Sequence, residues 1–315
     1  MKNAKSVFDK EALKAQKQNK RRKRKNHMII AIATVLCTSL ALVFLAPIVL
    51  TITNSFMSKT EIEWNYGSVL SSGVKRSEQV IASKVNLKFL PDQVTLKQYN
   101  EVLFKNPDYL IKFWNSVILT LPIVIFQILV SMGAAYGLSR HRSKWKEVVF
   151  FIYIVMMLMP YQVTLVPNYL VADKLNILNS NWAIWLPGIF SPFAVYMLTK
   201  YIRRIPTSLI EAAQIDGCGE WKIFWKIAFP LSKGSMMAVG ILLFIDYWNM
   251  VEQPVILIAD QIKHPLSVFL SKINTNDVGL AFAVATIYLF MPLFVFLYGE
   301  ESLVEGITFQ GGVKG

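Results

Sequence analysis

Long apolar stretches, separated by charged loops, dominate the sequence. Six of them are long enough, or nearly so, to cross a membrane as a helix, which takes about 20 residues. The six stretches are 28–50, 112–138, 148–168, 182–199, 234–258 and 279–298. The pattern therefore predicts an all-α fold, a polytopic membrane bundle of six transmembrane helices.

Proline recurs inside these stretches. The positions include Pro122, Pro160, Pro187, Pro192, Pro254 and Pro292. Helix interiors in water rarely tolerate proline, whereas packed membrane helices do, because neighbouring groups satisfy the freed backbone carbonyls. We expect a bundle with kinked or irregular segments.

Basic residues in the loops predict the orientation of the bundle. Residues 1–27 hold eleven Lys and Arg against two acidic residues, and further basic residues follow the second and fourth stretches. The loops at 169–181 and 259–278 carry no net charge. Because basic loops remain on the cytoplasmic side, both termini are expected to be cytoplasmic.

This orientation divides the chain into three parts. They are a basic cytoplasmic N-terminal tail (1–27), a transmembrane domain (28–298) with an extracellular segment (54–110) and a cytoplasmic loop (200–233), and a cytoplasmic C-terminal tail (299–315). We expect the N-terminal tail to be disordered up to the membrane, because it is polar and rich in Lys and Gln. The extracellular segment is expected to form a small ordered cap.

Composition and charge exclude several classes of protein. Hydrophobic residues make up 54% and charged residues 17%, which excludes an ordinary soluble domain. The net charge of +13 lies mostly ahead of the first stretch, where it anchors the chain beside anionic lipid headgroups, so membrane lipid and no nucleic acid is the expected partner. Cys37 lies inside the first stretch and Cys218 in the cytoplasmic loop, so the two are not expected to pair and provide no disulfide framework.

Motifs for catalysis are missing from the sequence. No Gly-x-x-x-x-Gly-Lys-Ser/Thr phosphate loop, His-Glu-x-x-His or Gly-x-Ser-x-Gly motif occurs. His27, His141 and His264 are too scattered to form a metal cluster. We expect no catalytic residue, no metal site and no cofactor in this chain, which is then not an enzyme.

The cytoplasmic loop contains the most specific segment, Ile205–Gly217. Ser208 and Glu211 have the spacing of a capping box, and Gly217 provides the left-handed residue that ends a helix. A second, amphipathic helix follows, with Trp221 and Phe224 on its apolar stripe. We expect a short helix, a glycine hinge and a helix along the membrane surface.

This segment resembles a known family. Glu211-Ala212-Ala213, three residues, Gly217, nine residues and then Ile227–Pro230 resemble the Glu-Ala-Ala loop of the permease subunits of binding-protein-dependent ABC importers. The longer match is most similar to the maltose-type carbohydrate permeases, and it extends from about residue 28 to the end, with 62–88 as an insertion.

The resemblance implies a function and partners. The chain would be a multi-pass plasma-membrane protein of a prokaryote and would form half of a translocation pathway for a sugar or oligosaccharide. Its partners would be a second homologous permease subunit, two ATPase subunits that bind ATP and Mg²⁺, and an extracellular solute-binding protein. The residues that couple to the ATPase would be Glu211, Ala212, Ala213, Asp216 and Gly217. In the alternative interpretation, Glu211 only caps its own helix and the alanines only favour a helix.

Polar residues in the fifth stretch suggest a solute path. Asp246, Asn249 and Glu252 are spaced to share a broad helix face, and Trp248 lies among them. Ionisable groups inside a bilayer usually face a cavity or a partner, so these four residues either line the pathway or pack against a sister subunit. The resembled family does not lead us to expect an acid at Asp246.

Two rival functions remain open. An intramembrane enzyme would have only Asp246 and Glu252 as candidate catalytic groups. An ion-coupled secondary transporter would act without an ATPase, and such transporters often contain internal repeats, which this sequence does not show.

Overall fold

The computed structural model describes residues 2–71, 87–140, 144–272 and 278–308, and within these ranges the chain is helical apart from loops and one isolated bridge between Met57 and Val94. The first elements are α1 (Lys2–Asn54), α2 (Lys59–Ser71), α3 (Lys97–Asn100), the π-helix η1 (Glu101–Lys105), α4 (Pro107–Arg140), α5 (Lys144–Met157), α6 (Tyr161–Lys174), α7 (Trp182–Gly188) and α8 (Pro192–Ile202). The remaining ones are α9 (Thr207–Ile215), α10 (Glu220–Ile223), the π-helix η2 (Phe224–Ala228), α11 (Phe229–Leu231), α12 (Lys233–Trp248), α13 (Glu252–Leu257), the 3₁₀-helix η3 (Gln261–Lys263), α14 (Leu266–Ser271) and α15 (Val278–Thr308). The predicted all-α fold class is confirmed.

Long apolar helices dominate the structure. Four helical segments, Arg24–Asn54, Pro107–Arg140, Trp182–Ile202 and Val278–Val304, are long and apolar enough to cross a membrane. Two further pairs qualify only when each is taken as one bent span: α5 with α6, bent by 99°, and Glu220–Leu231 with α12, bent by 69°. The described residues thus hold four spans, or up to six.

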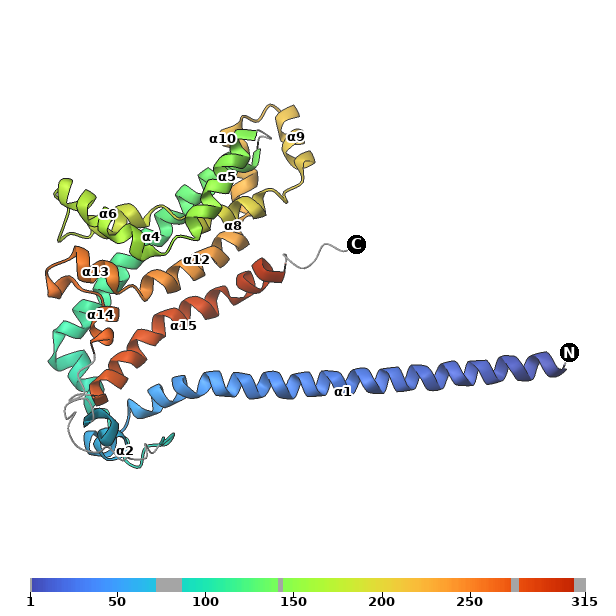
Figure 1. The fold of residues 1–315 in the computed structure, drawn as a ribbon, viewed down its shortest axis with the longest axis horizontal. Helices are drawn as coiled ribbons and strands as arrows, with labels where there is room; N and C mark the ends of the chain where they lie inside the picture. Colours follow the sequence, from blue (N-terminus) through green and yellow to red (C-terminus); the bar gives the residue numbers. More distant parts are fainter. Residues whose placement is uncertain (1, 72–86, 141–143, 273–277, 309–315) are drawn as a thin grey trace.

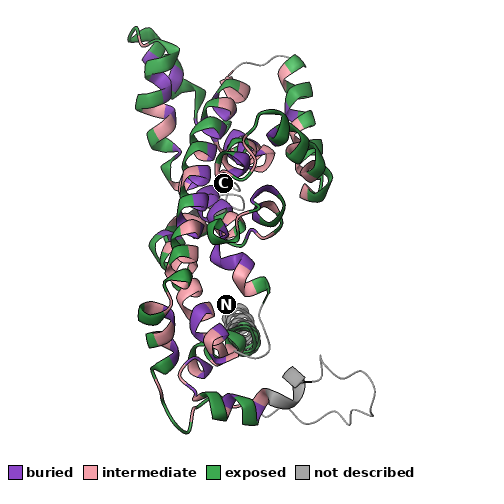
Figure 2. Cartoon of the chain, turned by 90° about the vertical axis from the view of Figure 1, so that its left-hand side faces the viewer, coloured by how far each residue is buried: buried purple, intermediate pink, exposed green. Residues whose placement is uncertain are grey.

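Helices α4, α8, α12 and α15 pack together and enclose the core, whereas α1 stands apart from them over most of its length (Figures 1 and 2). Trp248 is fully buried at the end of α12, between the stacked rings of Phe244 and Tyr288 and the edge of Phe113. Its indole nitrogen donates a hydrogen bond to the carbonyl of Tyr288. This aromatic cluster fixes α12 against α15.

The sequence pattern predicted that stretches 148–168 and 234–258 each form one helix, but both are interrupted in the structure. The first is broken between Met157 and Tyr161, because Pro160 has no N–H and disfavours a helical residue before it. The second ends at Trp248. Pro254 cannot donate to the carbonyl of Met250, which accepts a hydrogen bond from the Ser267 hydroxyl instead.

The N-terminal tail also differs from the expectation of disorder, since α1 runs as one helix from Lys2 to Asn54. Its polar part consists largely of Ala, Lys, Arg and Gln, which have high helix propensity. In segment 54–110, the described residues fold back on the end of α1: the amide of Thr95 bonds the Phe56 carbonyl, and Met57 is buried. Most of the predicted insertion at 62–88 lies outside the described residues.

Candidate functional site

The loop between α8 and α12 forms an elbow, which we define as residues 207–220. Helix α9 ends in a Schellman motif: the amide of Cys218 donates to the carbonyl of Ala213 at 2.9 Å, and that of Gly217 donates to Gln214 at 3.0 Å. Gly217 has φ +77°, which is the left-handed conformation that favours glycine. The predicted glycine hinge is therefore present.

The start of α9 differs from the predicted capping box. The helix begins at Thr207, directly after Pro206, and no side chain caps it. Because Ser208 already has a helical backbone, it cannot act as the N-cap. The glutamate predicted to reach back to it, Glu211, is an exposed side chain instead.

The two sides of α9 have different surroundings. Ile210 and Ala213 are buried against the core that includes Phe224, whereas Glu211, Ala212 and Ile215 face outward. Ala213 is thus a packing residue and does not belong to the exposed face. Ile215 is 86% exposed, although it is a large apolar side chain at the tip of the elbow. Leu209 and Ala212 on the same helix are exposed as well, and a group of exposed apolar residues, rather than a single one, marks a contact surface.

Glu220 connects the elbow to the bundle. Its carboxylate accepts hydrogen bonds from the Tyr136 hydroxyl at 2.7 Å, from the Arg140 guanidinium at 3.0 Å and from the Gln214 amide at 3.1 Å. Glu220 lies in the elbow, ahead of the apolar helix α12. The hydrogen bond from Arg140 lowers the pKa of its carboxyl group to about 2. The carboxylate therefore joins the end of α4 to both arms of the elbow.

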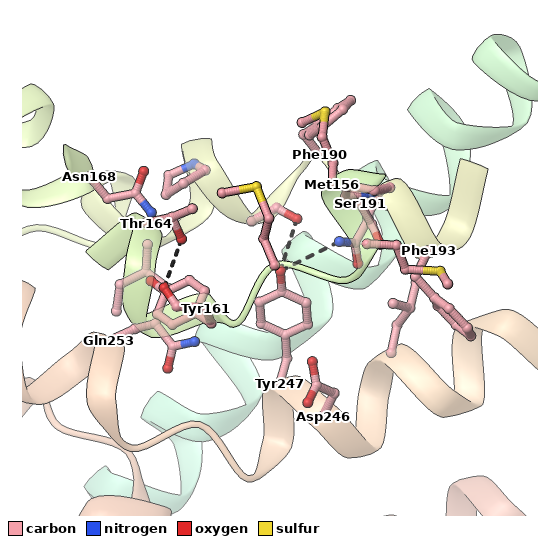
Figure 3. A pocket seen from close by; sticks show the side chains of 18 of the residues that line it. Met156, Tyr161, Thr164, Asn168, Phe190, Ser191, Phe193, Asp246, Tyr247 and Gln253 are labelled. Atoms are coloured by element: carbon pink, nitrogen blue, oxygen red, sulfur yellow. Dashed lines mark hydrogen bonds between the residues drawn. The ribbon is translucent and has the colours of Figure 1, made fainter. Parts of the chain in front are cut away.

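A second feature is a cavity of about 670 Å³ among α4, α6, α7, α8 and α12. The chain breaks between α5 and α6 and between α7 and α8 both contribute to its wall, as does the C-terminal part of α12 (Figure 3). Irregular backbone at membrane depth is tolerated where it lines a cavity or is covered by protein. The helix interruptions thus coincide with a hollow in the bundle.

Tyr247 organises one wall of this cavity. Its hydroxyl donates to the carbonyl of Gly188 and accepts from the amide of the buried Gln127, both at 3.4 Å. Gly188 permits close contact between α7 and α4, because a Cβ there would lie 3.1 Å from Ile123. Tyr247, which sequence reasoning did not single out, joins three helices at the cavity.

The four predicted path residues separate in the structure. Asp246 lines the cavity, whereas Trp248 is fully buried in the core and is not among the residues that line it. Asn249 lies beyond the end of α12, and Glu252 begins α13, where it accepts hydrogen bonds from Gln162 of α6. The prediction that Asp246, Asn249 and Glu252 share one helix face was wrong, because α12 ends at Trp248 and contains only Asp246 of the three.

The family described as "Binding-protein-dependent transport system inner membrane component" matches residues 127–299, more than half of the chain. The chain belongs to this family. The match begins in α4 and ends in α15, so it contains both the elbow and the cavity.

Curated members of the family show the same relationship. The arabinooligosaccharides transport system permease protein AraQ of Halalkalibacterium halodurans is 29% identical over 253 residues, which cover 79% of this chain and 90% of that protein. LacG, a lactose transport system permease protein of Rhizobium radiobacter, is 29% identical over 67% of this chain and 78% of its own length. The polygalacturonan/rhamnogalacturonan transport system permease protein YtcP of Bacillus subtilis is 30% identical over 67% and 72%.

A solved structure supports the family fold. It is the crystal structure of a bacterial ABC transporter involved in the import of the acidic polysaccharide alginate, and one of its chains matches with a TM-score of 0.71. The match has 20% sequence identity and covers 88% of this chain and 97% of the other. This member of the inner membrane component family therefore shares the helical fold of that chain.

Proposed function

We propose that this chain is the transmembrane permease subunit of an ATP-driven importer and forms half of the translocation pathway for a sugar or oligosaccharide. Its family and the names of its relatives support a permease for saccharides. The observation that supports the ATP-driven part is the elbow, in which α9 ends in a Schellman motif and exposes one side on a charged surface. The sequence itself contains no nucleotide-binding motif.

The proposed topology has six spans and two cytoplasmic termini. Each bent helix pair contributes one span in this arrangement, which adds two to the four other segments. In the second pair the span is α12, and Glu220–Leu231 lies at the cytoplasmic surface. The elbow lies among basic residues at one end of the bundle, including Arg140, Lys200, Arg203 and Lys222. The positive-inside rule assigns this end to the cytoplasm. Segment 54–110 is then extracellular.

Coupling is proposed to act through the outward side of the elbow. Glu211, Ala212 and Asp216 would dock into an ATPase subunit together with Ile215, and Gly217 would fix the angle between α9 and α10. Because Glu220 joins α10 to the end of α4, a displacement of the elbow would move the bundle as well. Closure of two ATPase subunits would then rock the permease halves and alternate access to the cavity.

The proposed assembly contains this subunit, a homologous permease, two ATPase subunits and an extracellular solute-binding protein, all in or at a bacterial plasma membrane. ATP and Mg²⁺ bind to the ATPase subunits, so this chain holds no cofactor of its own and is not an enzyme. A complex purified through this chain should contain an ATPase with a phosphate-binding loop.

The substitution Gly217→Pro tests the coupling role. Proline fixes φ near −65°, which is incompatible with the +77° at this position, so the elbow cannot keep its angle. We expect ATP hydrolysis stimulated by the binding protein to fall at least about tenfold, while the amount of protein in the membrane is unchanged.

Gly219→Ala is the matched control, because Gly219 has φ −71° and a Cβ there meets nothing within 4 Å. It should keep wild-type stimulation. If Gly217→Pro instead lost membrane protein and activity in equal measure, the elbow would be a folding element rather than a coupling element.

A further inference from the structure

Asp246 is an uncompensated negative charge in the wall of the cavity. It lies in the apolar helix α12, and among the described residues its carboxylate forms no ion pair and accepts no hydrogen bond. Figure 3 shows it beside the Tyr247 ring. Since a charge inside a bilayer is costly, an unpaired carboxylate in such a helix indicates a functional role.

The remaining polar groups of the cavity are neutral. Thr164, Asn168, Ser191 and Gln253 contribute hydroxyl and amide groups, and the described lining contains no Lys, Arg or His. Tyr161 adds an aromatic ring on the side of α6 (Figure 3). Amides, hydroxyls and aromatic faces match the hydroxyls and apolar faces of sugar rings, and the volume is within the range of small-molecule sites.

We propose that this cavity is a saccharide-binding site in which Asp246 selects uncharged saccharides against acidic ones. The inference rests on the proposed transport function and adds the charge class of the solute. A carboxylate on the solute would approach that of Asp246 with no cation between them. At a separation of about 10 Å and an effective dielectric constant of about 20, this repulsion weakens binding roughly tenfold.

The shared fold does not set this preference. The solved relative belongs to an importer of an acidic polysaccharide, and LacG and YtcP are named for a neutral and an acidic class of saccharide. The choice between the two classes must therefore come either from residues in the pathway of each permease or from the binding protein. In this chain, Asp246 is placed to distinguish them.

The test uses the assembled transporter in lipid nanodiscs without its binding protein, and two probes that differ in charge, galactotriose and trigalacturonate. Saturation-transfer NMR with competition gives the affinity of each probe. Wild type should bind galactotriose about tenfold more tightly than trigalacturonate. Asp246→Asn keeps the shape of the side chain and should reduce this ratio to about one.

Asp173→Asn, which removes an exposed carboxylate outside the cavity, is the matched control and should keep the wild-type ratio. Equal wild-type affinities, no wild-type binding of either probe, or an unchanged ratio in Asp246→Asn would overturn the proposal. Uptake that depends on ATP, measured after the same complex is reconstituted into proteoliposomes with its binding protein, separates the two claims: the permease function fails only if that dependence is absent.

Discussion

Glu220 shows how much one side chain contributes to the elbow. Its carboxylate accepts four hydrogen bonds from three side chains of α4 and α9, and the two residues on α4 lie 80 and 84 residues away in sequence. Nothing in the local pattern around Glu220 indicates these partners. Gly217, by contrast, was predictable, because a glycine directly after an apolar helix usually ends it.

The Glu220 interaction predicts a dependence of stability on pH. Arg140 holds the pKa of Glu220 at about 2, below its ordinary value of 4.5, so the carboxylate contributes stability above about pH 4.5 and loses this contribution as the pH falls toward 2. The group is about half exposed, which limits the effect. Glu220→Gln should lower the melting temperature by about 2 °C at pH 7, and the difference should shrink below pH 4.5.

Differential scanning fluorimetry of the transporter in detergent measures this difference. Glu63→Gln is the control, because Glu63 is an exposed glutamate on α2, outside the elbow, and it should leave the melting temperature unchanged at every pH. A difference for Glu220→Gln that is equally large at pH 7 and pH 3 would show that charge is not its cause.

The packing of α12 determines where the fifth apolar stretch stops being helical. Apolar length predicted a helix to residue 258, but the carbonyls that would continue it accept side-chain donors instead: Trp248 accepts from Tyr288, and Met250 from Ser267. These donors lie on α14 and α15, far along the chain. The hydrophobic pattern locates membrane helices well, but it cannot reveal a helix end that depends on distant partners.

Contact between α12 and α15 provides a test at this scale. Gly299 is buried on α15, and a Cβ there would lie 3.2 Å from Ile241 Cγ1 and 3.5 Å from Met237 Cγ, both on α12. Gly299→Leu should overpack this contact and destabilise the protein by about 1–3 kcal/mol. The melting temperature and the amount of folded protein in the membrane should both fall.

Gly133→Leu is the matched control, because a Cβ at Gly133 on α4 meets nothing within 4 Å. Its effect should be small. If the two substitutions behaved alike, leucine itself rather than the α12–α15 contact would be responsible.

At the scale of the molecule, the elbow and the cavity belong to one connected frame. Helix α4 contributes Gln127 to the cavity and, at its C-terminal end, Tyr136 and Arg140 to the elbow. A movement that begins at the elbow can therefore reach the cavity through a single helix. The sequence motif predicted where coupling would occur, but this mechanical link became visible only in the folded chain.

Site-directed crosslinking from the elbow tests the central claim most directly. A photoreactive amino acid is placed at Ile215, which is exposed at the tip, or at Ala213, which is buried behind it. On illumination in whole cells, position 215 should form a crosslink with an ATPase subunit on the cytoplasmic side, and position 213 should form far less. A crosslink from position 215 to an extracellular protein, or none to any ATPase, would contradict the account.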